Sequence, residues 1–236
     1  MQTVIVTGAS SGIGRSIALQ LAKMRYSLVV TGRDEKKLSR LKDIINGYGA
    51  ECLTVVADLE DQNAPMQIVE RTINHFGQID ILVNNAGMAH AAPISDTGNE
   101  VWDQLFTVNA RAPFLLCRQA IPYLKRSKNP IIINIGSVVG FKGYAGQAAY
   151  AASKHALTGF TKVLAREVQE DGIKVHLISP GGVDTTMATA MRPDIDTDNL
   201  ISPEEIAELV EFLVTRRGKG TIDHFYVRRK NGLAFD

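Results

Sequence analysis

Tyr150 and Lys154 stand four residues apart in the stretch Tyr-Ala-Ala-Ser-Lys. On a helix, residues i and i+4 lie on the same face. A free tyrosine hydroxyl has a pKa near ~10 and exchanges protons poorly at neutral pH. An ammonium a few ångströms away favours the phenolate and lowers that pKa. The pair could therefore move a proton to or from a substrate oxygen, although the same spacing also occurs on many helices as a purely structural feature.

Ser137 precedes this pair and follows the apolar run Pro130–Ile135, which is predicted to be a strand. Ligands of open α/β sheets bind beyond the carboxyl ends of the strands. A serine hydroxyl at such a strand end can donate a hydrogen bond to a substrate carbonyl. Taken alone, Ser137 is also a reasonable turn residue.

A glycine-rich turn, TGASSGIG at residues 7–14, lies between a β-branched run and an amphipathic stretch. Its glycines allow a tight turn and a close approach of the backbone to a pyrophosphate. The amino terminus of the following helix then offers free N–H groups to the phosphates. This placement predicts dinucleotide binding, with an ordinary turn as the alternative.

Seven short β-branched or apolar runs are separated by connections long enough for helices. Most runs are continuously apolar, as expected for strands covered on both faces. This alternation predicts a single α/β domain over residues 1–236, with a doubly wound parallel sheet and helices on both faces. A (β/α)8 barrel is the rival fold, which the glycine-rich first turn disfavours. The predicted strands are Thr3–Thr7, Ser27–Thr31, Leu53–Ala57, Ile79–Val83, Pro130–Ile135, Ile173–Ile178 and Ile222–Val227.

Three helices have recognisable patterns. Ile13–Met24 and Glu35–Ile45 each place their apolar residues on one stripe. Ser202-Pro203-Glu204-Glu205 starts a third helix with a serine cap and a glutamate at its third position. Residues 185–201 have no clear pattern and are predicted to form a flap over the site.

The glycine spacing G-x3-G-x-G, with Thr7 in front, resembles the opening motif of the short-chain dehydrogenase/reductase family. Further motifs of that family occur in the same order along most of the chain. They are Asp58 after the third strand, Asn84–Gly87 after the fourth, Val108-Asn109 within a helix, Ser137 after the fifth strand, the YxxxK of residues 150–154, and Pro180-Gly181 with Thr185 after the sixth. Any one motif is weak evidence, but the ordered set is highly specific.

The resemblance implies a role for each site residue. Tyr150 would exchange the proton of the carbonyl oxygen, Ser137 would hold that oxygen, and Lys154 would lower the pKa of Tyr150 while binding the nicotinamide ribose. Asn109 would fix a water that links Lys154 to solvent. Hydride would pass directly between the nicotinamide and the substrate carbon, so no metal is expected. The implied cofactor-binding residues are Gly8, Ser10, Ser11, Gly12, Ile13, Gly14, Arg33, Asp58, Leu59, Asn84, Asn85, Ala86, Gly87, Tyr150, Lys154, Pro180, Gly181, Val183 and Thr185.

The end of the second strand bears on the choice between NAD and NADP. Gly32 occupies the position where NAD-preferring members carry an acidic residue, and Arg33 follows it. A guanidinium can pair with the 2′-phosphate of NADP, and Arg15 could assist. NADP is therefore expected rather than NAD. The alternative is that Arg33 is a solvated charge and that Asp34, which also looks like a helix cap, recognises the ribose.

Composition narrows the other classes. The 236 residues include 26 Lys and Arg against 25 Asp and Glu, a formal net charge of +1. We therefore expect no nucleic-acid partner, and no membrane partner because no apolar run is long enough. Two distant cysteines and five scattered histidines predict no disulfide scaffold and no metal site, and favour a cytoplasmic protein.

The carboxyl-terminal stretch departs from the glycine-bearing last strand of many family members, acyl-carrier ketoreductases included. It reads Ile222–Val227 followed by Arg228, Arg229 and Lys230, which are predicted to be a solvated or subunit-facing cluster. This ending favours a small-carbonyl or hydroxy-acid enzyme over a ketoacyl reductase. The family commonly forms dimers or tetramers, so a homo-oligomer is expected.

The leading hypothesis is an NADP(H)-dependent oxidoreductase that interconverts a ketone or aldehyde and its alcohol, with a small-molecule substrate. One alternative is an enzyme similar to 3-oxoacyl-(acyl carrier protein) reductases. Another is a non-catalytic dinucleotide sensor on the same fold, although a sensor would not need Ser137, Tyr150 and Lys154.

Overall fold

Seven parallel strands form the centre of the computed structural model, which describes residues 1–191 and 195–232. They run in the order β3-β2-β1-β4-β5-β6-β7, so the sheet is doubly wound and the barrel alternative is wrong. All seven predicted strands are present, with bounds that differ by a few residues. The strands are β1 (Thr3–Val6), β2 (Ser27–Gly32), β3 (Cys52–Val56), β4 (Ile81–Asn84), β5 (Ile131–Ile135), β6 (Lys174–Pro180) and β7 (His224–Val227).

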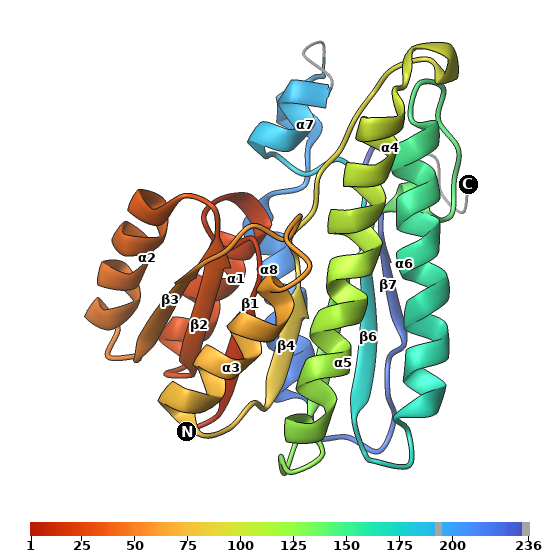
Figure 1. The fold of residues 1–236 in the computed structure, drawn as a ribbon. Helices are drawn as coiled ribbons and strands as arrows, with labels where there is room; N and C mark the ends of the chain where they lie inside the picture. The colour runs from red at the N-terminus through yellow and green to blue at the C-terminus, as the bar shows by residue number, and fades with distance from the viewer. Residues whose placement is uncertain (192–194, 233–236) are drawn as a thin grey trace.

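Helices cover both faces of the sheet (Figure 1). One face carries α1 (Gly12–Lys23), α2 (Glu35–Gly47) and α8 (Pro203–Thr215), and the other carries α3 (Ala64–Phe76), α5 (Ala112–Leu124) and α6 (Ala148–Glu167). The helix α4 (Asn99–Phe106) leads into α5 through a π-helical turn at Thr107–Arg111.

Alternate residues of one strand enter two different cores. Val4 and Val6 of β1 pack with α1, α2 and α8, whereas Ile5 packs with α3 and α5. All three side chains are fully buried. This explains why the strands are continuously apolar in sequence, since neither face is left to solvent.

Helix starts follow the predicted caps. Asp34 accepts a hydrogen bond from the Lys37 backbone N–H at 3.0 Å, so it is the cap of α2. Ser202 and Glu205 form a reciprocal capping box at the start of α8. Such contacts fix the residue at which each helix begins, and thereby where the loop after the preceding strand ends.

The predicted flap contains a short helix, α7 (Thr186–Met191), and a 3-10 turn at Thr197–Asn199. Residues 192–194 of the flap lie outside the described residues. A bridge between Val183 and Ile201 closes its base. In Figure 1, α7 lies beyond the sheet, above the carboxyl ends of the strands.

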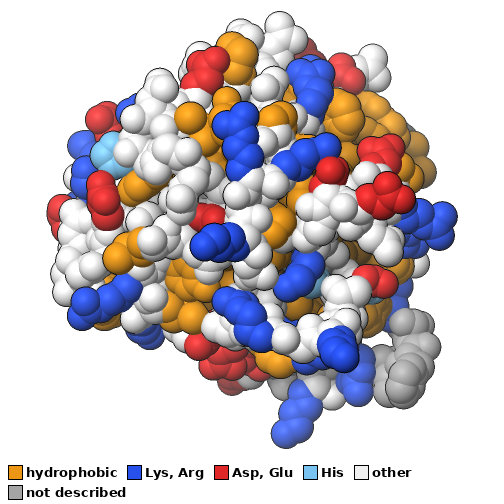
Figure 2. All heavy atoms as spheres, turned by 90° about the horizontal axis from the view of Figure 1, so that it is seen from below, with side chains coloured by type: hydrophobic (Ala, Val, Ile, Leu, Met, Phe, Trp, Pro, Cys, Tyr) orange, Lys and Arg blue, Asp and Glu red, His pale blue; other side chains and the backbone are white. Residues whose placement is uncertain are grey.

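The opposite end of the molecule carries charges of both signs. Figure 2 shows Lys and Arg side chains interspersed there with Asp, Glu and apolar side chains. In the described ranges, no helix combines the length and the apolarity that a membrane crossing requires.

Candidate active site

A cavity of about 580 Å³ lies where the carboxyl ends of the strands meet the flap. The strand order reverses between β1 and β4, and such a switch point is where open α/β sheets bind ligands. Nearly all the sequence-predicted site residues line this one cavity. They are Gly8, Ser10, Ser11, Gly12, Ile13, Arg33, Asp58, Leu59, Asn85, Ala86, Gly87, Ser137, Tyr150, Lys154, Pro180, Gly181, Val183 and Thr185.

The glycine-rich turn has a backbone that other residues would strain. Gly8 has φ of +64° and Gly12 has φ of +53°, in the left-handed region that favours glycine. A Cβ at Gly8 would lie 2.8 Å from the Cα of Ala86. The turn therefore presents backbone without side chains to the cavity, which allows a pyrophosphate to approach it closely.

Gly14 does not line the cavity. A Cβ at this position would lie 2.5 Å from the backbone oxygen of Gly8 and would also collide with the Asn85 side chain. Its role in this structure is to let the start of α1 pack closely against the turn, which matches the third glycine of dinucleotide-binding turns.

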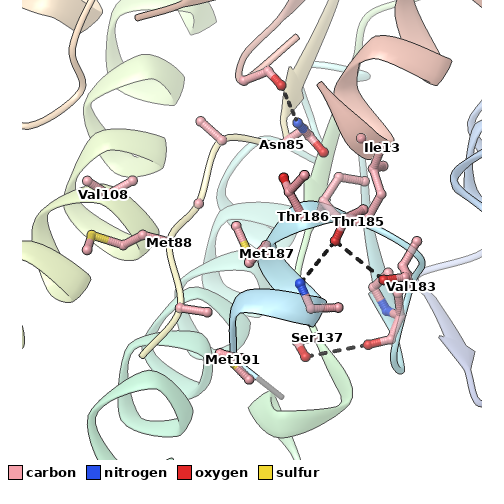
Figure 3. A pocket seen from close by; sticks show the side chains of 18 of the residues that line it. Ile13, Asn85, Met88, Val108, Ser137, Val183, Thr185, Thr186, Met187 and Met191 are labelled. Carbon is pink, nitrogen blue, oxygen red and sulfur yellow. Dashed lines mark hydrogen bonds between the residues drawn. The ribbon is translucent and has the colours of Figure 1, made fainter. Parts of the chain in front are cut away.

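Thr7 and Asn85 tie the glycine-rich turn to the end of β4. The Thr7 hydroxyl oxygen accepts hydrogen bonds from the backbone N–H groups of Asn85 at 3.0 Å and Ala86 at 2.9 Å. The Asn85 side chain donates back to the Thr7 carbonyl at 2.8 Å and the Gly8 carbonyl at 3.3 Å. Figure 3 shows this amide beside the turn. These bonds fix two walls of the cavity relative to each other.

Asn84, in contrast, lies in the core. Its amide donates to Asn134 at 2.8 Å and to the Cys117 sulfur at 3.3 Å, and only 2% of its surface is exposed. The expectation that Asn84 lines the cofactor path is therefore wrong, because successive side chains of a strand point to opposite sides.

Arg33 lies at the β2 end of the cavity with an exposed side chain. Its guanidinium lies 3.9 Å from the Asp58 carboxylate and 4.0 Å from that of Glu60. A Cβ at Gly32 would lie 3.2 Å from the Ser10 hydroxyl oxygen. Bare backbone, a hydroxyl and a guanidinium thus adjoin one another, which fits a phosphate group. Arg15 is exposed on α1 and does not line the cavity.

Ser137 and Tyr150 lie side by side in the wall of the cavity. The Ser137 hydroxyl donates to the Pro180 carbonyl at 3.4 Å, as Figure 3 shows. Tyr150 is 8% exposed. Burial raises the pKa of its phenol above the ordinary value, and hydrogen bonding with Ser137 opposes that rise. A phenol that stays protonated at neutral pH can give a proton to a carbonyl oxygen.

Lys154 follows one turn later on α6, and its ammonium donates to the Ile135 carbonyl at 3.1 Å. Burial lowers the pKa of Lys154 to about 8. A Cβ at Gly87 would lie 3.5 Å from the ammonium nitrogen, so glycine keeps this side of the lysine open. The expectation of a lowered pKa for Tyr150 is therefore wrong for this structure, because burial dominates and raises the pKa of the phenol.

Asn109 is fully buried and does not line the cavity. Its side chain accepts from the Met88 backbone N–H at 2.9 Å and donates to the Met88 carbonyl at 2.9 Å and to Ser153 at 3.0 Å. Ser153 in turn donates to the Tyr150 carbonyl at 2.8 Å. Asn109 therefore holds the segment around Met88, which follows β4, against α6, the helix that carries Tyr150. The water-binding role of Asn109 stays a prediction.

Thr185 starts the flap. Its hydroxyl donates to the Val183 carbonyl and accepts from the Ala188 backbone N–H, both at 3.3 Å (Figure 3). A Cβ at Gly12 would lie 3.0 Å from the Thr185 methyl carbon. The flap base thus meets the glycine-rich turn.

Sequence reasoning missed several residues that line the cavity. Arg229, expected in a solvated or subunit-facing cluster, is half-buried and lines the cavity, whereas Arg228 and Lys230 are exposed. The signal that could have found Arg229 is its place just after the last predicted strand, because ligands of open α/β sheets bind beyond the carboxyl ends of the strands. The other missed residues here are Met88, Ala89, Val139, Tyr144, Gln147, Gly182, Met187, Met191 and Ile195.

The lowered pKa of Lys154 predicts a pH-dependent stability. Between pH about 8 and the ordinary value of 10.5, the unfolded chain retains a proton on this lysine that the folded chain has released. The contribution of Lys154 to the free energy of unfolding should therefore rise with pH across that window. The buried thiols of Cys52 and Cys117, whose pKa burial raises to about 12, act in the opposite direction but equally in wild type and variant. Urea unfolding of wild type and Lys154→Met, below the window and across it, should show the wild type gaining stability relative to the variant. The exposed-lysine variant Lys128→Met should keep a constant difference from wild type, and a constant difference for Lys154→Met would contradict the burial argument.

Comparisons with known proteins agree with this geometry. A family model described as short chain dehydrogenase matches residues 2–196. An uncharacterized oxidoreductase of Staphylococcus epidermidis is 33% identical over 227 residues, which cover 96% of each chain. The 3-oxoacyl-[acyl-carrier-protein] reductase FabG of Staphylococcus aureus is 33% identical over 92% of each chain. The solved structure of a metagenomic short-chain oxidoreductase in complex with NADP is 32% identical, with a TM-score of 0.85 over 98% of each chain.

Proposed function

The chain belongs to the short-chain dehydrogenase family and is an oxidoreductase, and on that premise we propose that it uses NADP(H) to interconvert a small ketone or aldehyde and its alcohol. The observation that carries the proposal is one cavity that holds a glycine-rich turn, the half-buried Ser137 and the buried pair Tyr150 and Lys154. The turn alone would suit a sensor, but a buried phenol beside a serine hydroxyl suits proton transfer to a substrate oxygen.

The cofactor would lie between the glycine-rich turn and the flap. The backbone of residues 8–13 and the start of α1 would hold the pyrophosphate, Asp58 and Leu59 would contact the adenine, and Thr185 and Val183 would hold the carboxamide. The nicotinamide supplies a hydride to the substrate carbon or takes one from it.

The protein residues then act on the substrate oxygen. In reduction, Ser137 donates a hydrogen bond to the carbonyl oxygen and Tyr150 gives it a proton, so the product is an alcohol. In oxidation, Tyr150 takes the alcohol proton. Lys154 binds the ribose and favours the phenolate once Tyr150 has given up its proton. Asn109 acts as a positioning residue through Met88 and Ser153.

Arg33 is proposed to select NADP over NAD. The guanidinium would pair with the 2′-phosphate, a group that NAD lacks, and its two ion pairs with Asp58 and Glu60 are long enough to exchange for that contact. Solved structures with bound NADP among the similar proteins support this choice.

Arg33→Ala is expected to weaken NADPH binding by roughly 10- to 100-fold, as for loss of a charge-assisted hydrogen bond. NADH binding should change little. Fluorescence titration of both reduced cofactors measures the two affinities, with Arg40→Ala, an exposed arginine on α2, as the matched control. Equal losses for NADPH and NADH would remove the phosphate assignment.

A panel of ketones, β-keto esters, acyl thioesters and sugars tests the reaction itself. NADPH oxidation with ketones or keto esters is expected. Preference for acyl thioesters would favour a role like that of the Staphylococcus aureus relative. Tight NADPH binding without turnover of any carbonyl would favour the sensor alternative.

A further inference from the structure

The chain that follows β7 runs directly beside the part of the cavity that holds Ser137 and Tyr150, here called the reacting end. The backbone N–H of Gly181 donates to the Val227 carbonyl at 2.7 Å. A Cβ at Gly181 would lie 3.5 Å from the backbone nitrogen of Arg229. Gly181 follows Pro180, whose carbonyl accepts the Ser137 hydroxyl. This bond anchors Val227, and the Arg229 backbone lies beside Gly181, one residue from the Pro180 carbonyl that orients Ser137.

The side chain of Arg229 extends between the end of β6 and the flap. A Cβ at Gly182 would lie 3.6 Å from the Cδ atom of Arg229 and 3.8 Å from the Cδ1 atom of Ile195. Gly182, Ile195 and Arg229 all line the cavity. The aliphatic stem thus lies beside Gly182, which Ile195 of the flap also approaches, and Arg229 forms part of the cavity wall.

The guanidinium of Arg229 has no anionic partner within residues 1–191 and 195–232, and its side chain makes no hydrogen bond there. The neighbouring Arg228 differs, because it donates to the carbonyls of Arg229, Lys230 and Gly232 at 2.8 to 3.2 Å. Arg228 thus holds the tail together, whereas Arg229 keeps its donors available. A half-buried arginine whose donors are free suits a planar anion.

The charges and apolar side chains that line the cavity around Arg229 narrow the class of ligand further. The carboxylates among the described lining residues, Asp58 and Glu60, lie at the other end beside Arg33. Apolar side chains surround the flap end, namely Met88, Val139, Met187, Met191 and Ile195. The other cation of the described lining residues at this end, Lys154, donates to the Ile135 carbonyl. The one remaining cation, Arg229, matches one carboxylate, whereas a phosphate monoester carries a charge of about −1.5 to −2 at neutral pH.

We propose that Arg229 binds a carboxylate of the substrate, so that the enzyme reduces keto acids to hydroxy acids and catalyses the reverse. This inference rests on the proposed function, since it names the substrate class of the same site. Hydride from NADPH would reach the carbonyl carbon and the Tyr150 proton its oxygen, while the carboxylate stays bound and unchanged.

A set of straight-chain keto acids, each paired with its methyl ester, tests the proposal. The acids differ in the distance between carbonyl and carboxylate, because the structure fixes the cation but not the chain length. In wild type, at least one acid should exceed its ester in kcat/KM. Arg229→Met keeps the stem and removes the charge, and should lower kcat/KM for that acid by roughly 10- to 100-fold. Its activity on the ester should remain.

Three further readouts separate the possible failures. Arg229→Lys should retain part of the preference for the acid, and Lys230→Met, an exposed neighbour, should retain all of it. An equal loss of kcat/KM for acid and ester in Arg229→Met would show that Arg229 only supports the structure of the flap, and would overturn the proposal. A large loss of NADPH affinity in that variant would assign Arg229 to the cofactor and also overturn it.

The proposal and the general function fail in different ways. If neutral ketones react and no acid exceeds its ester, the reductase function stands and the carboxylate site is wrong. If no compound reacts, saturation-transfer NMR of each acid and ester on the NADP⁺-bound protein decides the question. Acid-selective binding that is lost in Arg229→Met would support the carboxylate site, and equal binding of acid and ester would overturn it.

Discussion

Replacing Tyr150 with phenylalanine is expected to lower kcat by about 10²- to 10⁴-fold, the range that a positioned proton donor contributes. The substitution removes one hydroxyl and keeps the ring. Because Tyr150 packs with Leu105, Val139 and Ala149, the phenylalanine should occupy the same space. NADPH affinity and the unfolding midpoint should therefore change little.

The reason for so large an effect lies in the surroundings of the hydroxyl. Burial raises the pKa of Tyr150, so the phenol is protonated at neutral pH and can act as an acid. The Ser137 hydroxyl remains in the variant and can still orient the carbonyl, but an aliphatic hydroxyl is a far weaker acid than the phenol. Binding should survive while turnover is lost.

Steady-state turnover and NADPH titration on the same preparation check this result. Tyr123→Phe is a matched control, because Tyr123 lies on α5 outside the cavity and loses the same hydroxyl. Equal turnover in Tyr150→Phe and wild type would refute the acid role, and a parallel loss of cofactor affinity would instead indicate a binding role.

Gly14→Ala is the second substitution with a large expected effect. The added methyl would lie 2.5 Å from the Gly8 carbonyl oxygen and would collide with the Asn85 side chain. Neither can yield cheaply, since one is backbone and the other bonds to the Thr7 and Gly8 carbonyls. Overpacking of this kind costs about 1–3 kcal/mol of stability. The displaced turn should also lose most of its NADPH affinity.

Urea unfolding and NADPH titration measure both effects of Gly14→Ala. Gly47→Ala is the matched control, since a Cβ at that position, the last residue of α2, meets nothing within 4 Å. That control should bind NADPH like wild type and be at least as stable, because alanine restricts the unfolded chain. Two variants with equal stability and equal affinity would contradict the packing role of Gly14.

Local sequence patterns were sufficient to predict the sheet and one half of the site. Continuous apolar strands follow from helices on both faces, and Asp34 at the start of α2 follows from local capping chemistry. The glycine-rich turn is likewise local, because its left-handed glycines and the next helix are adjacent in sequence. These features depend on neighbours along the chain, so the sequence carries them directly.

The other half of the site depends on distant segments. Arg229 reaches the cavity only because β7 pairs with β6, which places the tail beside Gly181. Asn84 and Asn85 are neighbours, yet strand alternation sends one into the core and the other to the cavity. Asn109 is buried by a π-helical turn between α4 and α5, which no local motif predicted.

Transfer of deuterium tests the central claim most directly. Wild type is incubated with a reactive carbonyl compound and NADPH that carries deuterium at the transferable ring position. Mass spectrometry should find the deuterium on the former carbonyl carbon of the alcohol product. NADPH that binds in the cavity but passes no deuterium to any carbonyl compound would contradict the account.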